Sequence, residues 1–419
     1  MPREVLFRIF SFLDSKILLQ IQFVCKYWYQ ATREENLWKD RLKETFHNWF
    51  EDFDFNYFDI TLWRDIYWKT HQIYSNWHKT RQSSKILRSY ERTIRQIQVT
   101  QKYLGYAHGA EIELRDQFSQ DELFHIRPDF TDGVPYIKCF HIFDSKLVCS
   151  AGPGWTHINV YDLKDGRLVC GWPSVEPHPI EAIAFSDQFI VTGSRKCIVW
   201  DVNTRTPVQT FTEQQRGVVN SIQFDDNLLV CSHKGRKVRI WDIKSGKRIF
   251  TVQGHQHLIH CLQYDDNILA TGSKDKTLRI WDKYKGFQCS AVLRGHTESV
   301  RTLNLQGWKI VSGSKDGDVR IWDVSGNPNL VSTLTSSLND LPNTLQKSPS
   351  LDELFYDIKP TKSIPRPRSI GRLSGSDPIF SVASSSSRLY VGTKNLRVYD
   401  FNVENPSGTV WDKIKSFFE

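Results

Sequence analysis

Short apolar segments separated by polar turns recur through most of the chain. In one stretch, the apolar residues 261–264 precede an Asp-Asp-Asn turn, the segment 268–273 follows, and a Lys-Asp turn leads into 277–282. Apolar runs of four to six residues between Asp, Asn, Gly and Lys are typical of buried strands joined by tight turns. The pattern therefore predicts an all-β core made of stacked strands.

This pattern repeats with a period near forty residues. The last strand of each copy ends in Trp-Asp or Tyr-Asp, and the final Asp of each pair is Asp162, Asp201, Asp242, Asp282, Asp323 or Asp400. Successive markers are 39, 41, 40, 41 and 77 residues apart. A strand before Trp-Asp at this period resembles the WD40 repeat, which implies four-stranded blades of a β-propeller.

Seven blades are predicted, with six or eight as open alternatives. Six marked copies start at Tyr136, and the segment upstream has the same layout, with strands near 96–99, 103–107 and 111–115 and Asp116 at the marker position. A propeller closes when the two ends of the chain share a blade. The missing outer strand is therefore expected from Leu87 to Arg95 or from the tail after Pro406.

The 77-residue interval predicts an insertion between two blades. The segment 326–376 is rich in Ser, Pro, Asn and Leu and contains neither a Trp nor a second marker. Such a composition is typical of a disordered loop and not of a degenerate blade.

The resemblance to WD40 repeats also implies a buried chain of hydrogen bonds in the complete repeats. Its members would be a His, a Ser or Thr, an Asp and the marker Trp. The two sets are His255, Thr271, Asp275 and Trp281, and His296, Ser312, Asp316 and Trp322. Buried polar groups need partners, so these histidines are interpreted as structural and not as metal ligands or catalytic bases.

The first 42 residues have helical spacing of apolar positions. Val5, Leu6, Ile9, Phe10 and Leu13 fall three and four residues apart, and two further short helices are expected after Asp14-Ser15. Three helices this short cannot bury their apolar surface among themselves, which implies a partner.

The sequence FSFLD followed by VCKYW and NLWK resembles the F-box, which docks on the Skp-family adaptor of SCF-type cullin-RING ubiquitin ligases. The alternative is a plain helical cap on the propeller. The resemblance implies these adaptor contacts: Pro2, Val5, Leu6, Ile9, Phe10, Leu13, Leu19, Val24, Cys25 and Trp28. An F-box before a WD40 propeller resembles the F-box/WD40 substrate receptors, and the last strands are similar to those of dactylin-type members.

The expected organisation has four parts. An F-box at 1–42 precedes an aromatic-rich helical linker at 43–92, the propeller spans 93–406 with the insertion inside it, and a tail covers 407–419. The segment LWRDIYWKTHQIYSNW has helical spacing, and its aromatic face is expected to join the F-box rigidly to the propeller.

Composition narrows the function classes. The chain of 419 residues carries 55 basic and 47 acidic residues, a net charge of +8, which favours acidic partners without establishing nucleic-acid binding. No signal peptide or 18-residue apolar run is present, and the eight cysteines lack Cys-x-x-Cys spacing, so reduced thiols in the cytoplasm or nucleus are expected. No catalytic, cofactor or metal motif is found.

A ring of basic turn residues is the candidate substrate site. Equivalent positions after the second strand of successive repeats, together with the start of one inner strand, give this set: Arg195, Lys234, Lys274, Arg301, Lys315 and Lys394. The set predicts binding of an acidic or phosphorylated peptide, against the simpler alternative of solvated turn residues paired with neighbouring acids. The predicted function is a non-catalytic substrate receptor of an SCF-type ligase. A WD40 interaction scaffold without a ubiquitin role is the alternative, and nucleic-acid or membrane binding is not expected.

Overall fold

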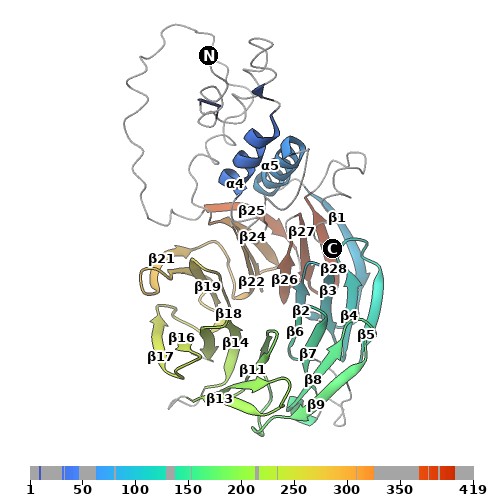
Figure 1. Cartoon of the computed structure of the whole chain (residues 1–419), viewed down its shortest axis with the longest axis vertical. Helices are drawn as coiled ribbons and strands as arrows, with labels where there is room; N and C mark the ends of the chain where they lie inside the picture. Colours follow the sequence, from blue (N-terminus) through green and yellow to red (C-terminus); the bar gives the residue numbers. More distant parts are fainter. Residues whose placement is uncertain are drawn as a thin grey trace.

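The computed structural model describes residues 9–10, 31–32, 34–46, 63–79, 82–128, 137–151, 153–212, 217–233, 235–307, 309–324, 368–375, 377–385 and 387–401. Within these ranges the strands form seven four-stranded antiparallel sheets arranged in a ring, with two helices beside it (Figure 1). The predicted seven-bladed propeller is confirmed.

Blades 1 to 4 follow one another along the chain, each strand pairing with the next. Blade 1 contains β2 (Ile94–Val99), β3 (Tyr103–His108), β4 (Glu111–Asp116) and β5 (Glu122–Ile126). Blade 2 contains β6 (Phe140–Phe143), β7 (Lys146–Ala151), β8 (His157–Asp162) and β9 (Leu168–Pro173), with the short helix η2 (Pro153–Trp155) between β7 and β8. Blade 3 contains β10 (Ala182–Phe185), β11 (Phe189–Gly193), β12 (Cys197–Asp201) and β13 (Pro207–Phe211). Blade 4 contains β14 (Val219–Phe224), β15 (Leu228–His233), β16 (Lys237–Asp242) and β17 (Arg248–Gln253).

Blades 5 to 7 complete the ring. Blade 5 contains β18 (Ile259–Tyr264), β19 (Ile268–Ser273), β20 (Leu278–Asp282) and β21 (Gln288–Leu293). Blade 6 contains β22 (Val300–Gln306), β23 (Lys309–Ser314), β24 (Asp318–Asp323) and β25 (Arg368–Ser374). Blade 7 contains β26 (Ser381–Ser384), β27 (Arg388–Gly392), β28 (Asn395–Asp400) and, from the other end of the propeller, β1 (Ser83–Ser89).

The burial of each strand follows its place in the blade. All six residues of β19 are buried, in agreement with its continuous apolar run, whereas most of β17 and half of β21 are exposed. Side-chain amides join neighbouring inner strands: Gln98 donates to the carbonyl of Ile142 at 2.8 Å and accepts from its N–H at 2.7 Å. Gln223 makes the same pair of bonds to Tyr264. These bonds hold the inner strands in register around the channel.

The ring closes through β1, whose residues Ser83 to Ser89 pair antiparallel with β28. The expectation of a closing strand from the N-terminal side is right, but the proposed segment 87–95 is wrong because it spans the end of β1 and the start of β2. Tyr90, between these strands, donates its N–H to the Lys394 carbonyl at 3.0 Å. The propeller therefore begins at Ser83, and the linker expected at 43–92 is shorter.

The predicted insertion also needs correction. Arg368 to Ser374 form β25, the outer strand of blade 6, which pairs with β24 from Asp318 to Asp323. The extra chain thus interrupts one blade between its third and fourth strands and does not connect two blades. Its residues 325–367, and the predicted tail 407–419, lie outside the described residues.

The helices share one hydrophobic core with blades 6 and 7. Helix α4 (Glu35–Phe46) extends past the F-box boundary expected at residue 42, and α5 (Trp63–Lys79) matches the predicted linker helix. The Trp77 ring stacks on Phe401 with centroids 3.7 Å apart, and the Nζ of Lys309 lies 3.6 Å from the Trp77 centroid. The common core includes Trp38, Tyr74, Val311 and Val391. Figure 1 shows both helices beside β24, β25 and β27.

Candidate functional site

Two complete hydrogen-bonded sets support the turns that carry the basic residues of blades 5 and 6. In blade 5, His255 bonds to Asp275 at 2.7 Å and to Thr271 at 2.8 Å, and the Trp281 Nε1 donates to Thr271 at 2.9 Å. We call these four residues the blade tetrad. Blade 6 repeats it: His296 bonds to Asp316 at 3.1 Å and to Ser312 at 2.8 Å, and Trp322 donates to Ser312 at 2.9 Å. The predicted hydrogen-bonded chains are confirmed.

The carboxylate of Asp275, the residue next to Lys274, accepts hydrogen bonds from within its own blade. Asp275 accepts from His255, from the N–H of Gln256 at 2.9 Å and from the Thr277 hydroxyl at 2.6 Å. Burial acts to raise the pKa of Asp275, but these hydrogen bonds outweigh it and hold the pKa well below its ordinary value. Asp275 is thus an ionised structural group, and no ion pair joins it to Lys274 in the described part of the chain.

A cavity of about 570 Å³ opens between blades 5 and 6, above these turns. Its titratable and charged lining is mostly basic: His257, His260, Lys274, Lys276, Arg301 and Lys315, against the acids Asp275 and Glu298. Lys274, Arg301 and Lys315 are exposed, and none of the three makes an ion pair with another described residue. The guanidinium of Arg301 lies 6.0 Å from the Phe380 ring. The cavity can therefore attract an anionic ligand.

Two basic residues of other blades are neutralised by neighbouring acids. Lys138, two residues before β6 of blade 2, makes an ion pair with Glu181 at 2.9 Å and lies 4.6 Å from the centroid of the Trp155 ring. In blade 3, Lys196 pairs with Glu176 at 3.4 Å. Lys274, Arg301 and Lys315, by contrast, are exposed cations without such a partner among the described residues, and they share one cavity.

Three of the six predicted substrate-binding residues come together in this cavity: Lys274, Arg301 and Lys315. Arg195 and Lys394 are exposed at the equivalent turns of blades 3 and 7 and do not line it. Lys234 lies outside the described residues. Sequence reasoning missed His257 and His260, because the loop before an inner strand and the first residues of that strand differ in type from one repeat to the next.

Of the ten predicted adaptor contacts, two are among the described residues. Ile9 is 42% exposed, so it is available to a partner. Phe10 is completely buried in the core shared with α4 and α5, which fits packing within the chain better than contact with a partner. The other eight lie outside the described residues: Pro2, Val5, Leu6, Leu13, Leu19, Val24, Cys25 and Trp28.

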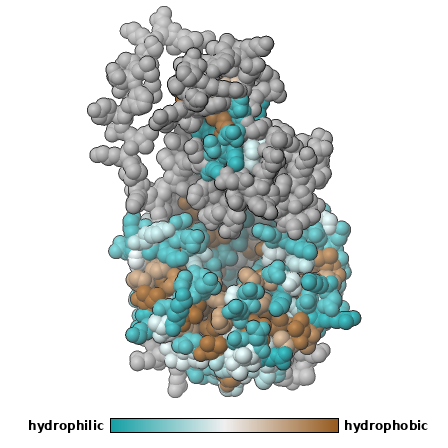
Figure 2. Space-filling model, in the orientation of Figure 1, coloured by the Kyte–Doolittle hydropathy of each residue, from teal (hydrophilic) through white to brown (hydrophobic). Residues whose placement is uncertain are grey.

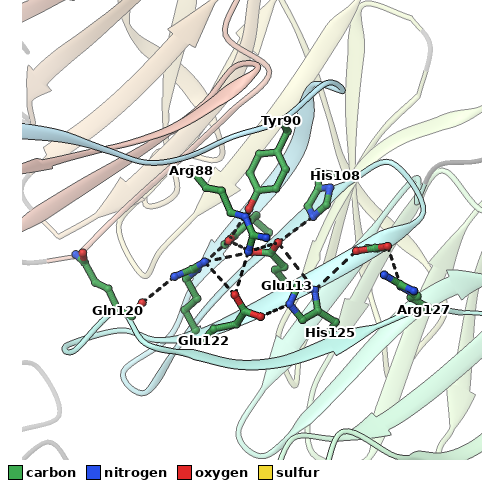
Figure 3. A network of polar contacts seen from close by, with 11 residues as sticks. Arg88, Tyr90, His108, Glu113, Gln120, Glu122, His125 and Arg127 are labelled. Carbon is green, nitrogen blue, oxygen red and sulfur yellow. Dashed lines mark hydrogen bonds and ion pairs between the residues drawn. The ribbon is translucent and has the colours of Figure 1, made fainter.

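Blade 1 has a polar network that the sequence reading missed (Figure 3). In register with the blade 5 tetrad, Tyr90 stands at the His255 position, Tyr106 at the Thr271 position and Arg115 at the Trp281 position. The hydroxyls of Tyr90 and Tyr106 lie 2.9 Å apart, and Arg115 donates to Tyr106 at 2.9 Å. With Asp116 at the marker position, Arg115 already stands in place of the marker Trp in the sequence.

Glu113 is the centre of this network. It is 1% exposed and accepts hydrogen bonds from Tyr106, from Tyr90 at 2.8 Å and from His108 at 3.2 Å. Arg88 of β1 approaches it at 3.3 Å. Burial acts to raise the pKa of Glu113, but the hydrogen bonds and the Arg88 charge outweigh burial and lower the pKa to about 2. The network therefore joins the closing strand to blade 1 through an ionised carboxylate.

No cluster of three or more metal-ligating side chains occurs in the described ranges. No helix in those ranges is long and apolar enough to span a membrane. The surface of the propeller seen in Figure 2 is largely hydrophilic, with apolar residues in separate patches.

Comparison with protein families places both parts of the chain. Residues 1–44 match the F-box-like model, and residues 205–242, 246–282 and 287–323 match the WD domain, G-beta repeat. The class defined by fold and sequence is thus a WD40 propeller with an N-terminal F-box-like domain. The chain is an F-box/WD40 protein.

Other similar proteins share a short stretch of sequence or the fold alone. Myosin heavy chain kinase C of Dictyostelium discoideum is 33% identical over 75 residues, and mitogen-activated protein kinase kinase kinase A of the same organism is 33% identical over 78 residues. Each match covers 17% of this chain, and the chain spans only 9% and 8% of these relatives. The crystal structure of the computationally designed Ika8 protein matches 75% of this chain and 98% of the designed one, with a TM-score of 0.52 and 19% identity. That likeness concerns the fold only.

Proposed function

We propose that this protein is the substrate-recognition subunit of an SCF-type E3 ubiquitin ligase. The F-box-like domain would bind a Skp-family adaptor and through it a cullin-RING ligase, and the propeller would bind a protein destined for ubiquitination and degradation. The observation that carries the proposal is the shared hydrophobic core that joins the F-box-like domain to blade 6, a blade that also lines the basic cavity. In this role the chain binds and positions, and the catalysis belongs to its partners.

The length of strand β23 gives the separation between the attachment of α5 and the basic cavity. Lys309 at its first residue touches Trp77 of α5, whereas Lys315, directly after its last residue, lines the cavity. Six residues of extended strand span about 20 Å. A substrate receptor has to hold its substrate at a set distance from the ubiquitin donor, and a buried core between the two ends supports such rigidity.

Adaptor binding is the first test. We expect the full chain to co-purify with a Skp-family adaptor in a stoichiometric complex and the exposed-face variant Ile9→Asp to lose most of that binding. Val175→Asp, at a propeller residue that is 64% exposed, is the matched control and should bind normally. Absence of binding by the unaltered chain would favour the alternative, an interaction scaffold without a ligase role.

We further propose that the cavity between blades 5 and 6 binds an acidic or phosphorylated segment of the substrate. Lys274, Arg301 and Lys315 supply positive charge from two blades, and Lys cannot make the bidentate contacts of Arg, so Arg301 is the strongest single candidate. Arg301→Gln should weaken binding of an acidic peptide about ten-fold. Lys164→Gln, at an exposed turn of blade 2, should leave binding unchanged.

The cytoplasm or nucleus is the proposed location. The seven cysteines that the structure describes are all free thiols, four of them buried: Cys139, Cys149, Cys197 and Cys231. Free thiols are usual in reducing compartments. Fluorescence microscopy of the tagged chain tests this location.

A further inference from the structure

His260 occupies the inner wall of the basic cavity. It is the second residue of the inner strand β18, it is half-buried, and it lines the cavity together with Lys274 and Arg301. Its backbone carbonyl accepts a hydrogen bond from Asn220 of β14 at 3.0 Å. Its imidazole makes no hydrogen bond or ion pair to another residue in the described part of the chain, so its nitrogens are open to a ligand.

The groups around this ring are mainly basic. From blade 5, the loop before β18 contributes His257, and the turn after β19 contributes Lys274, Asp275 and Lys276. From blade 6, β22 and its preceding loop contribute Arg301 and Glu298, and the turn after β23 contributes Lys315. From blade 4, β15 ends at the buried His233. Asp275 is held in the tetrad, which leaves Glu298 as the acid opposing this positive charge in the cavity.

We propose that His260 is a proton-dependent anion contact, so that an acidic ligand binds this cavity together with a proton taken up by the His260 ring. This inference rests on the proposed acidic-peptide site and names a form of regulation of that site. Ligand affinity would then depend on pH in the range between about 5.5 and 8, where histidine is the side chain whose unperturbed charge changes.

The direction follows from the charges. Burial, and then the positive charges of Arg301 and Lys274, lower the pKa of His260 below its ordinary value in the free protein. A bound anion offsets those positive charges and accepts a hydrogen bond from the protonated ring, which raises the pKa of His260. Binding is therefore linked to proton uptake, and affinity increases as the pH falls.

A fluorescein-labelled hexa-aspartate peptide is a suitable probe, because its carboxylates stay ionised above about pH 5.5. Anisotropy titrations from pH 5.5 to 8 at constant ionic strength should show binding about ten-fold tighter at the lower pH, the size of one charge-assisted hydrogen bond. His260→Gln should remove this slope, whereas His178→Gln, at a histidine that does not line the cavity, should retain it. Calorimetry in two buffers of different ionisation enthalpy should show proton uptake in the unaltered chain and none in His260→Gln.

The outcomes separate this inference from the site on which it rests. Binding that depends on Arg301 but not on pH, or a pH slope that persists in His260→Gln, would overturn the role of His260 and keep the acidic-peptide site. Absence of probe binding at every pH would overturn both. NMR titration of the His260 ring gives a second measurement, and an unchanged titration midpoint on addition of the peptide also contradicts the inference.

Discussion

The hydroxyl of Thr271 makes hydrogen bonds to two buried ring nitrogens. It bonds to the His255 Nε2 and accepts from the Trp281 Nε1, and all three side chains are buried. Thr271→Val keeps the shape but leaves the His255 Nε2 and the Trp281 Nε1 without a hydrogen bond. We expect a loss of about 2–3 kcal/mol in the free energy of unfolding, measured by denaturant titration. Thr251→Val on the exposed strand β17 should change it by less than about 0.5 kcal/mol.

Glu113 gives blade 1 a stability that depends on pH. Removing its charge by Glu113→Gln leaves Arg88 and Arg115 without their buried partner, and the expected cost is about 3 kcal/mol at pH 7. The pKa of Glu113 is lowered to about 2 in the folded protein, so the unfolded chain takes up this proton first as the pH falls.

The stabilisation from the Glu113 charge is therefore complete above about pH 5 and is lost as the pH approaches 2. Unfolding free energies of the unaltered chain and Glu113→Gln, measured from pH 7 down to the lowest pH at which both fold, should converge. A constant difference over that range would mean that the carboxylate acts by packing and not through its charge.

At the scale of elements, α5 is fixed to the propeller by one end. Asn76 donates to the Phe401 carbonyl at 2.7 Å, Trp77 stacks on the Phe401 ring, and Lys309, which lies against the indole, donates to the Ser385 carbonyl at 2.7 Å. Burial lowers the pKa of Lys309 well below its ordinary value, so an aromatic face and a carbonyl are the partners it needs.

Trp77→Ala should detach α5 without unfolding the propeller. Loss of a buried Trp costs about 3–5 kcal/mol in local packing, so hydrogen exchange of the α5 amides should accelerate strongly while β18 and β19 stay protected. Tyr284→Ala, at an aromatic residue that is 78% exposed, is the control and should change neither region. Equal acceleration in blade 5 would show that helix and propeller unfold as one unit.

The outer strands show where sequence patterns stop being informative. The inner strands and markers were predictable because their apolar runs repeat with the blade. Strand β1 is almost wholly exposed and β25 reads RSIGRLS, so neither carries an apolar alternation. Their pairing is decided by the open edges of β28 and β24, which exist only after the rest of each blade has formed. Both boundary errors come from these two strands.

At the scale of the whole molecule, the repeat predicted which turns carry basic residues but not which of them act together. Lys274, Arg301 and Lys315 meet because blades 5 and 6 are neighbours with complete tetrads and an open cavity. Lys138 is equally basic in the sequence, yet the structure pairs it with Glu181 across a blade boundary. Such pairing depends on contacts between different repeats, and the repeat period alone cannot predict those contacts.

The separation of the two ends of β23 leads to a prediction for the complete ligase. Trp77→Ala changes the attachment of the F-box-like region and lies on the far side of the strand from the cavity, so it should lower ubiquitin transfer at least about five-fold while acidic-peptide affinity stays the same. Arg301→Gln should instead lower the affinity for the acidic peptide and leave binding to the adaptor intact. Both variants are measured in a reconstituted adaptor complex with a substrate fused to the acidic peptide. If Trp77→Ala transfers ubiquitin as well as the unaltered chain, rigid spacing is unnecessary and the propeller serves only to tether its substrate.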